Sequence, residues 1–178
     1  MRYIAFLRGI NVGGRKSVKM EDLRRVITGM GYGNVQTYIQ SGNVIFDAEN
    51  DEATIRREIE VRLAAVFGFP ISAILRTAEE LSEVVESSPY GHELSENEKV
   101  SVTLLSAEPD TEAVEAVQEY AGDSTDDYSI RGREVYILTR SGYAGTAYSN
   151  GFFEKVFKVK ATTRNIEVLK KILELVES

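Results

Sequence analysis

The residue types that could bind an anion are concentrated at positions 8–16, in the segment Arg-Gly-Ile-Asn-Val-Gly-Gly-Arg-Lys. This segment holds three cations and three glycines, and it follows a short apolar run and precedes an amphipathic one. Glycines let main-chain N–H groups converge, and guanidinium groups match the oxygens of phosphates and carboxylates. The segment therefore indicates an anion-binding loop between a strand and a helix.

The same residues also fit a purely structural interpretation. No Gly-Lys-Ser/Thr ends the segment, and its glycine spacing is not that of a dinucleotide-binding fingerprint. The glycines could equally form a tight turn, with Arg8 paired to an acidic residue of the same sheet. Both interpretations stay open, and the candidate ligand residues of this loop are Arg8, Asn11, Gly13, Gly14, Arg15 and Lys16.

A second polar group lies near the C-terminal end, in the segment Ala-Thr-Thr-Arg-Asn at positions 161–165. We expect this segment at the start of the last helix, where Thr162, Thr163 or Asn165 can cap the helix. A cation is disfavoured at the positive end of a helix dipole, so Arg164 indicates an anionic partner beside it. That partner is either a ligand or an acidic residue of the protein itself.

Neutral hydrogen-bonding residues extend the candidate site. Gln40, Ser41 and Asn43 surround an expected hairpin turn, although turn chemistry alone also explains these residue types. Asn150 and Lys155 lie in the helix that we expect before the last one. These five residues complete the set of candidate ligand-binding positions.

Aromatic residues surround a glycine-containing segment at positions 140–149. Tyr143 is a candidate for stacking on a planar ligand, as aromatic side chains do with nucleobases. The spacing of Phe153 and Phe157 is instead typical of a helix that packs against a core. We expect Tyr143 to be the ligand candidate of this group.

Metal, cofactor and catalytic signatures are weak in this chain. The single histidine, His92, lies with Glu93, Glu96 and Glu98 in a segment without a recognised ligand spacing, so we expect no metal site. No cofactor is indicated. No nucleophile is recognisable beside a base, and the sequence leaves open whether the chain is an enzyme.

Charge and composition restrict the partners. The net charge is −7, yet residues 1–33 hold seven basic and two acidic side chains. The acidic centre makes duplex nucleic acid an unfavourable partner, whereas a small anion near the basic ends is compatible with this distribution. Cysteine is absent, and neither a signal peptide nor a membrane span is recognisable, so we expect a cytoplasmic protein. The sequence leaves open whether it is a monomer or a homodimer.

The expected elements repeat their order once along the chain. Residues 1–76 predict a strand, a helix, a hairpin, a long helix capped by Asn50 or Asp51, and a strand. Residues 77–98 predict a connecting helix, with Thr77 and Glu80 as a capping box, and a loop. Residues 99–178 predict strand, helix, hairpin and two helices that begin near 150 and 163.

The order βαββαβ is the signature of the ferredoxin-like sandwich. We therefore predict an α+β fold class with two packed ferredoxin-like lobes, the second having a terminal helix in place of its last strand.

Three separated segments add a resemblance to this pattern. They are residues 7–14, residues 37–44, and the Ser-Asn, Glu-Lys and Ala-Thr-Thr-Arg-Asn groups between 149 and 165. Together they resemble domain of unknown function family number 1697, over nearly the whole chain. The resemblance implies a small bacterial or archaeal cytosolic protein with two ferredoxin-like lobes, and it implies no catalytic role for any residue.

The leading functional hypothesis is a binding protein for a small anionic or nucleotide-like ligand, held between the 8–16 loop and the 162–165 helix start. The alternative is a protein-interaction or self-association module that uses its open sheet faces. A further alternative is an enzyme on a phosphorylated substrate, with Lys16 or Lys155 as acid or base. Binding of single-stranded RNA ranks below these three.

Overall fold

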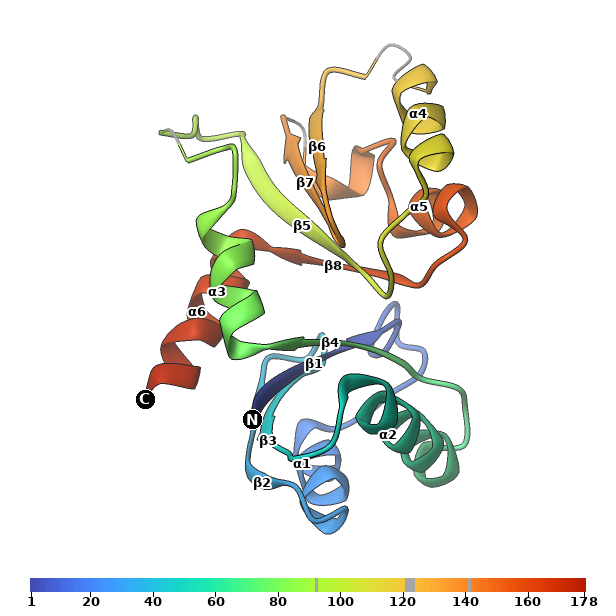
Figure 1. Cartoon of the computed structure of the whole chain (residues 1–178), viewed down its shortest axis with the longest axis vertical. Helices are drawn as coiled ribbons and strands as arrows, with labels where there is room; N and C mark the ends of the chain where they lie inside the picture. The colour runs from blue at the N-terminus through green and yellow to red at the C-terminus, as the bar shows by residue number, and fades with distance from the viewer. Residues whose placement is uncertain (92, 121–123, 141) are drawn as a thin grey trace. The chain divides into compact units, whose positions relative to one another are not determined.

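The computed structural model describes residues 1–91, 93–120, 124–140 and 142–178 (Figure 1). The chain divides into two compact units. Unit 1 comprises Met1–Ser82 with Ile172–Ser178, and unit 2 comprises Glu83–Lys171. Each unit contains a four-stranded antiparallel sheet.

Unit 1 has the predicted βαββαβ order. Its sheet order is β2-β3-β1-β4, so β1 is hydrogen-bonded on both sides. The elements are β1 (Arg2–Arg8), α1 (Met20–Gly29), β2 (Gly33–Tyr38), β3 (Asn43–Asp47), α2 (Glu52–Phe67) and β4 (Ser72–Thr77), followed by α3 (Ala78–Glu86).

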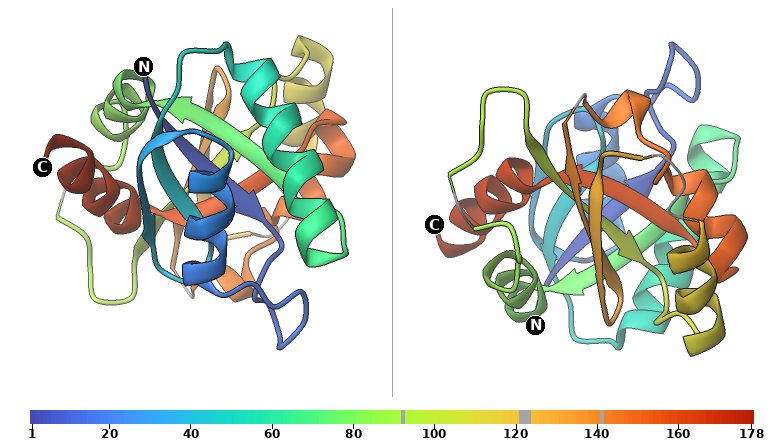
Figure 2. Two further views of the ribbon diagram at one scale, coloured as in Figure 1. Left: turned by 90° about the horizontal axis from the view of Figure 1, so that it is seen from below. Right: turned by 90° about the horizontal axis from the view of Figure 1, so that it is seen from above.

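The core of unit 1 lies between one face of its sheet and the two helices α1 and α2, which cover that face (Figure 2, left). The helices contribute Leu23 and Ile27 from α1 and a stripe from α2, while the strands contribute alternate residues. The buried members from α2 and the strands include Tyr3, Ala5, Leu7, Val44, Phe46, Ile55, Ile59, Leu63, Ala73 and Leu75.

Unit 2 repeats this arrangement with the sheet order β6-β7-β5-β8. Its elements are β5 (Lys99–Leu105), α4 (Thr111–Glu119), β6 (Asp127–Arg131), β7 (Glu134–Thr139), a 3₁₀ turn η1 (Tyr143–Gly145), α5 (Asn150–Phe157) and β8 (Ala161–Asn165). The terminal helix α6 (Ile166–Glu177) begins in unit 2, and its residues from Ile172 onward belong to unit 1. The predicted α+β class with two ferredoxin-like lobes, the second ending in a helix, is confirmed.

The terminal helix starts later than the sequence predicts. Residues 161–165 form β8, which pairs antiparallel with β5 through Thr163↔Thr103 and Arg164↔Val102, and α6 begins only at Ile166. The threonines suit a strand as well as a helix cap, and pairing with β5 satisfies main-chain groups that a cap would leave open. Unit 2 therefore has both a fourth strand and a terminal helix.

The two units share a short sequence repeat that the residue pattern alone did not indicate. Arg76-Thr-Ala-Glu-Glu-Leu81 and Arg164-Asn-Ile-Glu-Val-Leu169 each run from the last strand into the helix that follows. In both strands the arginine is buried, and its Nη1 donates to the main-chain oxygen of the preceding residue. The repeat supports a duplicated strand–helix unit.

Predicted helix caps form at the starts of α2 and α3. The Asp51 carboxylate accepts from the Thr54 main-chain N–H at 3.0 Å. The capping box of Thr77 and Glu80 forms in both directions, at 2.8 and 3.1 Å. Asp110 occupies the cap position of α4 without a side-chain cap hydrogen bond.

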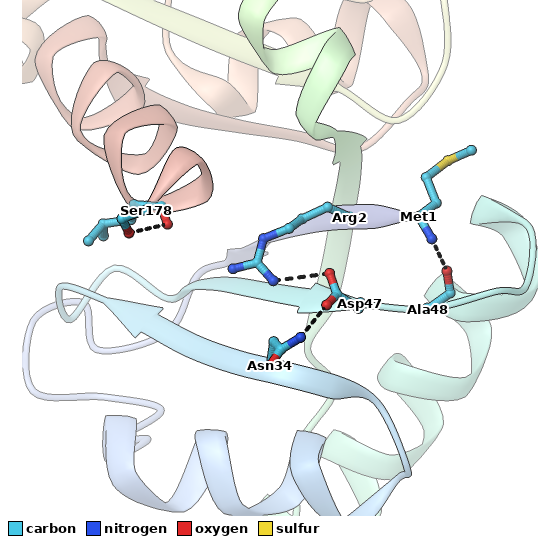
Figure 3. Close-up of polar contacts among 7 residues, drawn as sticks. Met1, Arg2, Asn34, Asp47, Ala48 and Ser178 are labelled. Atoms are coloured by element: carbon cyan, nitrogen blue, oxygen red, sulfur yellow. Dashed lines mark hydrogen bonds and ion pairs between the residues drawn. The ribbon is translucent and has the colours of Figure 1, made fainter.

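A polar cluster fixes the outer part of the unit 1 sheet (Figure 3). The register of β2 and β3 shifts between Gly33 and Gln36, and Asn34 takes a positive φ of 47° there. Asp47 lies opposite Arg2 in β3 and accepts from Arg2 at 3.0 Å and from Asn34 at 2.6 Å. Asp47 thus joins three strands across this bulge.

No helix among the described residues is long and apolar enough to cross a membrane.

We expect Asp47→Asn to destabilise the protein by about 0.5 kcal/mol at neutral pH, a small effect because 37% of the Asp47 side chain is exposed and solvent screens the pair. The hydrogen bond from Asn34, with Arg2, lowers the pKa of Asp47 below its ordinary 3.8. This stabilisation is therefore present above pH 3.8 and is lost as the pH falls through the lower pKa of the folded state.

Urea unfolding at a series of pH values measures the difference between wild type and Asp47→Asn. Glu49→Gln, at an exposed neighbouring carboxylate, is the matched control. A difference between wild type and Asp47→Asn that does not shrink at low pH would contradict this role for Asp47.

Candidate functional site

Residues 11–16 form a β-hairpin that extends away from the sheet of unit 1 (Figure 2). The main-chain N–H of Arg15 donates to Val12 at 3.1 Å, and that of Asn11 donates to Lys16 at 3.1 Å. Gly13 and Gly14 make the two-residue turn, with φ values of 58° and 72°. Positive φ at both central positions is the reason that this turn takes Gly-Gly.

This hairpin differs from the converging anion loop that the glycines suggested. The Arg15 N–H is used within the turn, and residues 17–19 separate the hairpin from α1, which begins at Met20. Main-chain donors therefore do not gather at the helix start. The cations of this region remain the groups able to attract an anion, and we call residues 8–19 the basic hairpin.

Asn11 holds the base of the hairpin. Its Nδ2 donates to the main-chain oxygens of Val18 and Gln40, at 2.9 and 2.8 Å, and its Oδ1 accepts from the Val18 N–H at 2.8 Å. Both amide hydrogens are thus committed to the fold. In the structure the side chain of Asn11, a predicted ligand residue, anchors the hairpin.

The turn after β2 packs against this base. A Cβ at Gly42 would lie 2.6 Å from Ile10 Cδ1, so only glycine fits at this close approach. Asn43 is buried, and its Nδ2 donates to the main-chain oxygen of Tyr38 at 2.8 Å and to Ser41 Oγ at 3.1 Å. Turn chemistry accounts for Asn43, whereas the Gln40 side chain is exposed beside the hairpin base.

The basic hairpin is a concentration of positive charge on an acidic chain. Residues 8–20 contain Arg8, Arg15, Lys16 and Lys19 and no acidic residue, while the net charge of the chain is −7. The first acids that follow, Glu21 and Asp22, pair with Arg25 on α1. Arg15 and Lys16 are exposed and have no ion-pair partner among the described residues.

The second predicted group, residues 162–165, lies in β8 of unit 2. Arg164 is buried, which lowers its pKa to about 10, and its Nη1 donates to Thr162 Oγ1 at 2.8 Å. Asn165 accepts from the Glu167 N–H at 2.9 Å and so serves as the expected cap of the last helix. The expectation that Arg164 stands at the positive end of that helix was wrong, because the residue belongs to the preceding strand.

Four polar side chains of unit 2 form a connected network that we call the hydroxyl cluster: Thr103, Tyr143, Asn150 and Thr163. The Thr163 hydroxyl lies at its centre, 2.7 Å from the Thr103 hydroxyl and 3.1 Å from the Tyr143 hydroxyl, and it donates to Asn150 Oδ1. The Asn150 N–H donates to the Tyr143 hydroxyl at 3.2 Å. Thr103 was missed from the sequence because only the β5–β8 register brings it to Thr163.

Comparison of the two units shows that the fold does not require this network. The equivalent pair in unit 1, Ala5 and Leu75 on β1 and β4, is apolar and buried. The covering helices also differ: α2 has 16 residues and α5 has 8, and each ends at a residue of left-handed conformation. In unit 2 a loop with Tyr143 precedes the shorter helix, and the Tyr143 hydroxyl joins the cluster.

The remaining candidates take ordinary positions. Lys155 is exposed on α5, and Ser149 caps this helix by accepting from the Phe152 N–H at 3.2 Å. Phe153 and Phe157 are buried and stack at a centroid distance of 5.4 Å, as the helical spacing predicted. His92 lies outside the described residues, and within those residues no group of His, Cys, Asp and Glu could hold a metal ion.

Comparisons with known proteins agree with this architecture. The model of the family described as "Protein of unknown function (DUF1697)" matches residues 1–136. The solved structure of the conserved bacterial protein SP0830 from Streptococcus pneumoniae is similar over 99% of this chain and 98% of its own, with 25% identity and a TM-score of 0.80.

A solved structure of an unknown protein from Galdieria sulphuraria covers 92% of this chain and 96% of its own, with 11% identity and a TM-score of 0.29. None of the curated proteins matches the chain.

We expect Thr163→Val to destabilise the protein by roughly 1–2 kcal/mol, because it removes the central hydroxyl and leaves Tyr143 and Asn150 without this partner. Thr111→Val, at an exposed threonine on α4, is the control for the methyl substitution itself. Thermal and urea unfolding of both variants give the comparison. Equal stability of the two variants would show that the network contributes nothing measurable to folding.

Proposed function

The chain belongs to the DUF1697 family, whose description assigns no function, and we propose from the chain's own residues that it binds a small anionic ligand at the basic hairpin of unit 1. Phosphorylated small molecules, nucleotides included, are the ligand class. The observation that carries the proposal is the pair Arg15 and Lys16, exposed and without an acidic partner among the described residues.

The geometry of the hairpin supports this proposal. The Gly13–Gly14 turn and the Asn11 anchor hold the backbone of Arg15 and Lys16 in one conformation, which reduces the entropy lost when a ligand binds. A guanidinium group next to an ammonium group suits phosphate oxygens. The exposed Gln40 side chain beside the base adds a neutral donor.

Residues 162–165 are not part of the proposed anion site. These belong to unit 2, and Arg164 there is buried and hydrogen-bonded within its own strand. The proposed anion site therefore consists of hairpin residues with Gln40 and Ser41.

We expect inorganic pyrophosphate to shift the amide NMR signals of residues 11–16 in a saturable way. Arg15→Gln with Lys16→Gln should weaken this binding by at least about tenfold, since two charge-assisted contacts are lost. Added salt should weaken binding to the wild type because the site is exposed to solvent.

Arg57→Gln with Arg62→Gln is the matched control, because it removes two exposed cations from α2 of the same unit. The proposal fails if pyrophosphate produces no saturable shift in the hairpin, or if both double variants lose binding equally.

We also expect Gly14→Ala to weaken pyrophosphate binding although it leaves every charge in place. An alanine at φ 72° strains the turn, while the space around this position is open, so the effect arises from the backbone alone. Calorimetric titration of Gly14→Ala and of Gly29→Ala, a glycine at the end of α1 with open space around it and no positive φ, measures this effect. Unchanged affinity in Gly14→Ala would show that the cations act without help from the hairpin geometry.

A further inference from the structure

A groove of about 610 Å³ lies in unit 1 between the end of α1 and one side of α2, and it contains none of the basic hairpin. Its volume is within the range of small-molecule sites. Met30, which follows α1, lines one wall. The α2 residues that line it recur at helical spacing and differ from the sheet-facing stripe: Arg57, Glu58, Val61, Arg62 and Ala65.

The floor of the groove includes apolar surface that the core does not use. Val61 is 66% exposed, and Ala65 is also exposed. Met30 is half-buried and packs partly against the core. The side chain of Val61 gains little from folding at this position, and an apolar ligand part would bury it.

Two arginines border this apolar surface. Arg57 and Arg62 are exposed, and neither has an ion-pair partner among the described residues. Arg side chains bind carboxylates through paired N–H donors. The charge of this border therefore favours an anionic group at the end of an apolar ligand.

The carboxylate that lines the groove is engaged elsewhere. Glu58 accepts at 2.7 Å from the hydroxyl of Tyr32, which lies in the connection between α1 and β2. Burial of Tyr32, with this hydrogen bond, raises the pKa of the phenol, so Tyr32 remains a donor to Glu58 throughout the ordinary pH range. Glu58 is thereby held by Tyr32, while no such partner holds Arg57 and Arg62.

We propose that this groove binds a small amphiphilic carboxylate, a molecule with one hydrocarbon part and one carboxylate group. The hydrocarbon part lies against Met30 and Val61, and the carboxylate is bound by Arg57 and Arg62. This site is separate in residues and in ligand chemistry from the anion site proposed on the basic hairpin, so either proposal can fail without the other.

Titration with sodium octanoate tests the proposal, with the Met30 methyl signal and the amide signals of residues 57–65 followed by NMR. We expect saturable shifts confined to these signals. Octan-1-ol and octylammonium, which share the hydrocarbon chain, should bind at least about tenfold more weakly because they lack the carboxylate.

Matched variants separate the two contributions. Arg57→Gln with Arg62→Gln should weaken octanoate binding by about tenfold or more, whereas Arg15→Gln with Lys16→Gln should leave it unchanged. Val61→Ser should weaken it severalfold, and Val66→Ser, at an exposed valine of the same helix outside the groove, should not. Arg57→Gln alone repeats the test if the double variant does not fold.

Absence of a saturable shift at Met30 and α2 would overturn the proposal. So would equal binding of octanoate, octan-1-ol and octylammonium, which indicates an unspecific apolar surface. Loss of octanoate binding in the hairpin variant but not in the α2 variant would assign the carboxylate to the other site.

Discussion

The central strand of each unit is the constraint on which the rest of the structure depends. β1 is paired with β3 and β4, and β5 is paired with β7 and β8, so both strands use their main-chain groups on two sides. Residues 3–7 and 100–105 are buried throughout. Helices, turns and exposed loops can vary around such a strand, because its pairing fixes which residues share a face.

The duplicated framework explains where the two units are free to differ. The repeat places Arg76 and Arg164 at equivalent positions of the last strand of each unit. Each arginine donates to the main-chain oxygen of the residue before it. A buried charge is costly, so this shared feature is tied to the framework. The helix before the last strand instead differs between the units: α2 has 16 residues and α5 has 8. The hydroxyl cluster lies in unit 2, the unit with the shorter helix.

The basic side chains of unit 1 include exposed cations and cations that form ion pairs. Arg15, Lys16 and Lys19 of the basic hairpin are exposed, as are Arg57 and Arg62 on α2. Arg2 instead pairs with Asp47, and Arg25 pairs with Glu21 and Asp22 on α1. These ion pairs neutralise the charges of Arg2 and Arg25. The exposed cations keep a positive electrostatic potential around them in a chain of net negative charge, and for this reason both proposed ligands are anions.

Several features follow from neighbouring residues, and the sequence predicted them. Helical spacing gave α1, α2 and α5, and the capping box gave the start of α3. Runs of strand-forming residues on either side of a turn gave both hairpins. Even the hairpin of residues 11–16 agrees with the open interpretation in which glycines form a tight turn. These signals are local, since they depend on the conformation of a few residues.

The candidate site could be predicted only in part. The exposed cations Arg15 and Lys16 were identified from their residue types, but the anchoring role of Asn11 depends on contacts with Val18 and Gln40, the latter 29 residues away. Arg164 was assigned to a helix because capping residues surround it. Pairing with β5, some 60 residues earlier in the chain, made this segment a strand.

The sequence by itself determined the fold class, the order of elements and the concentration of charge near residue 8, because each is a property of composition or of local spacing. Only the tertiary structure decided the partners: Thr103 beside Thr163, Asn34 beside Asp47, and Met30 on the same groove as Val61. Strand register and packing between distant segments determine these pairs, and the periodicity of the sequence does not reveal them.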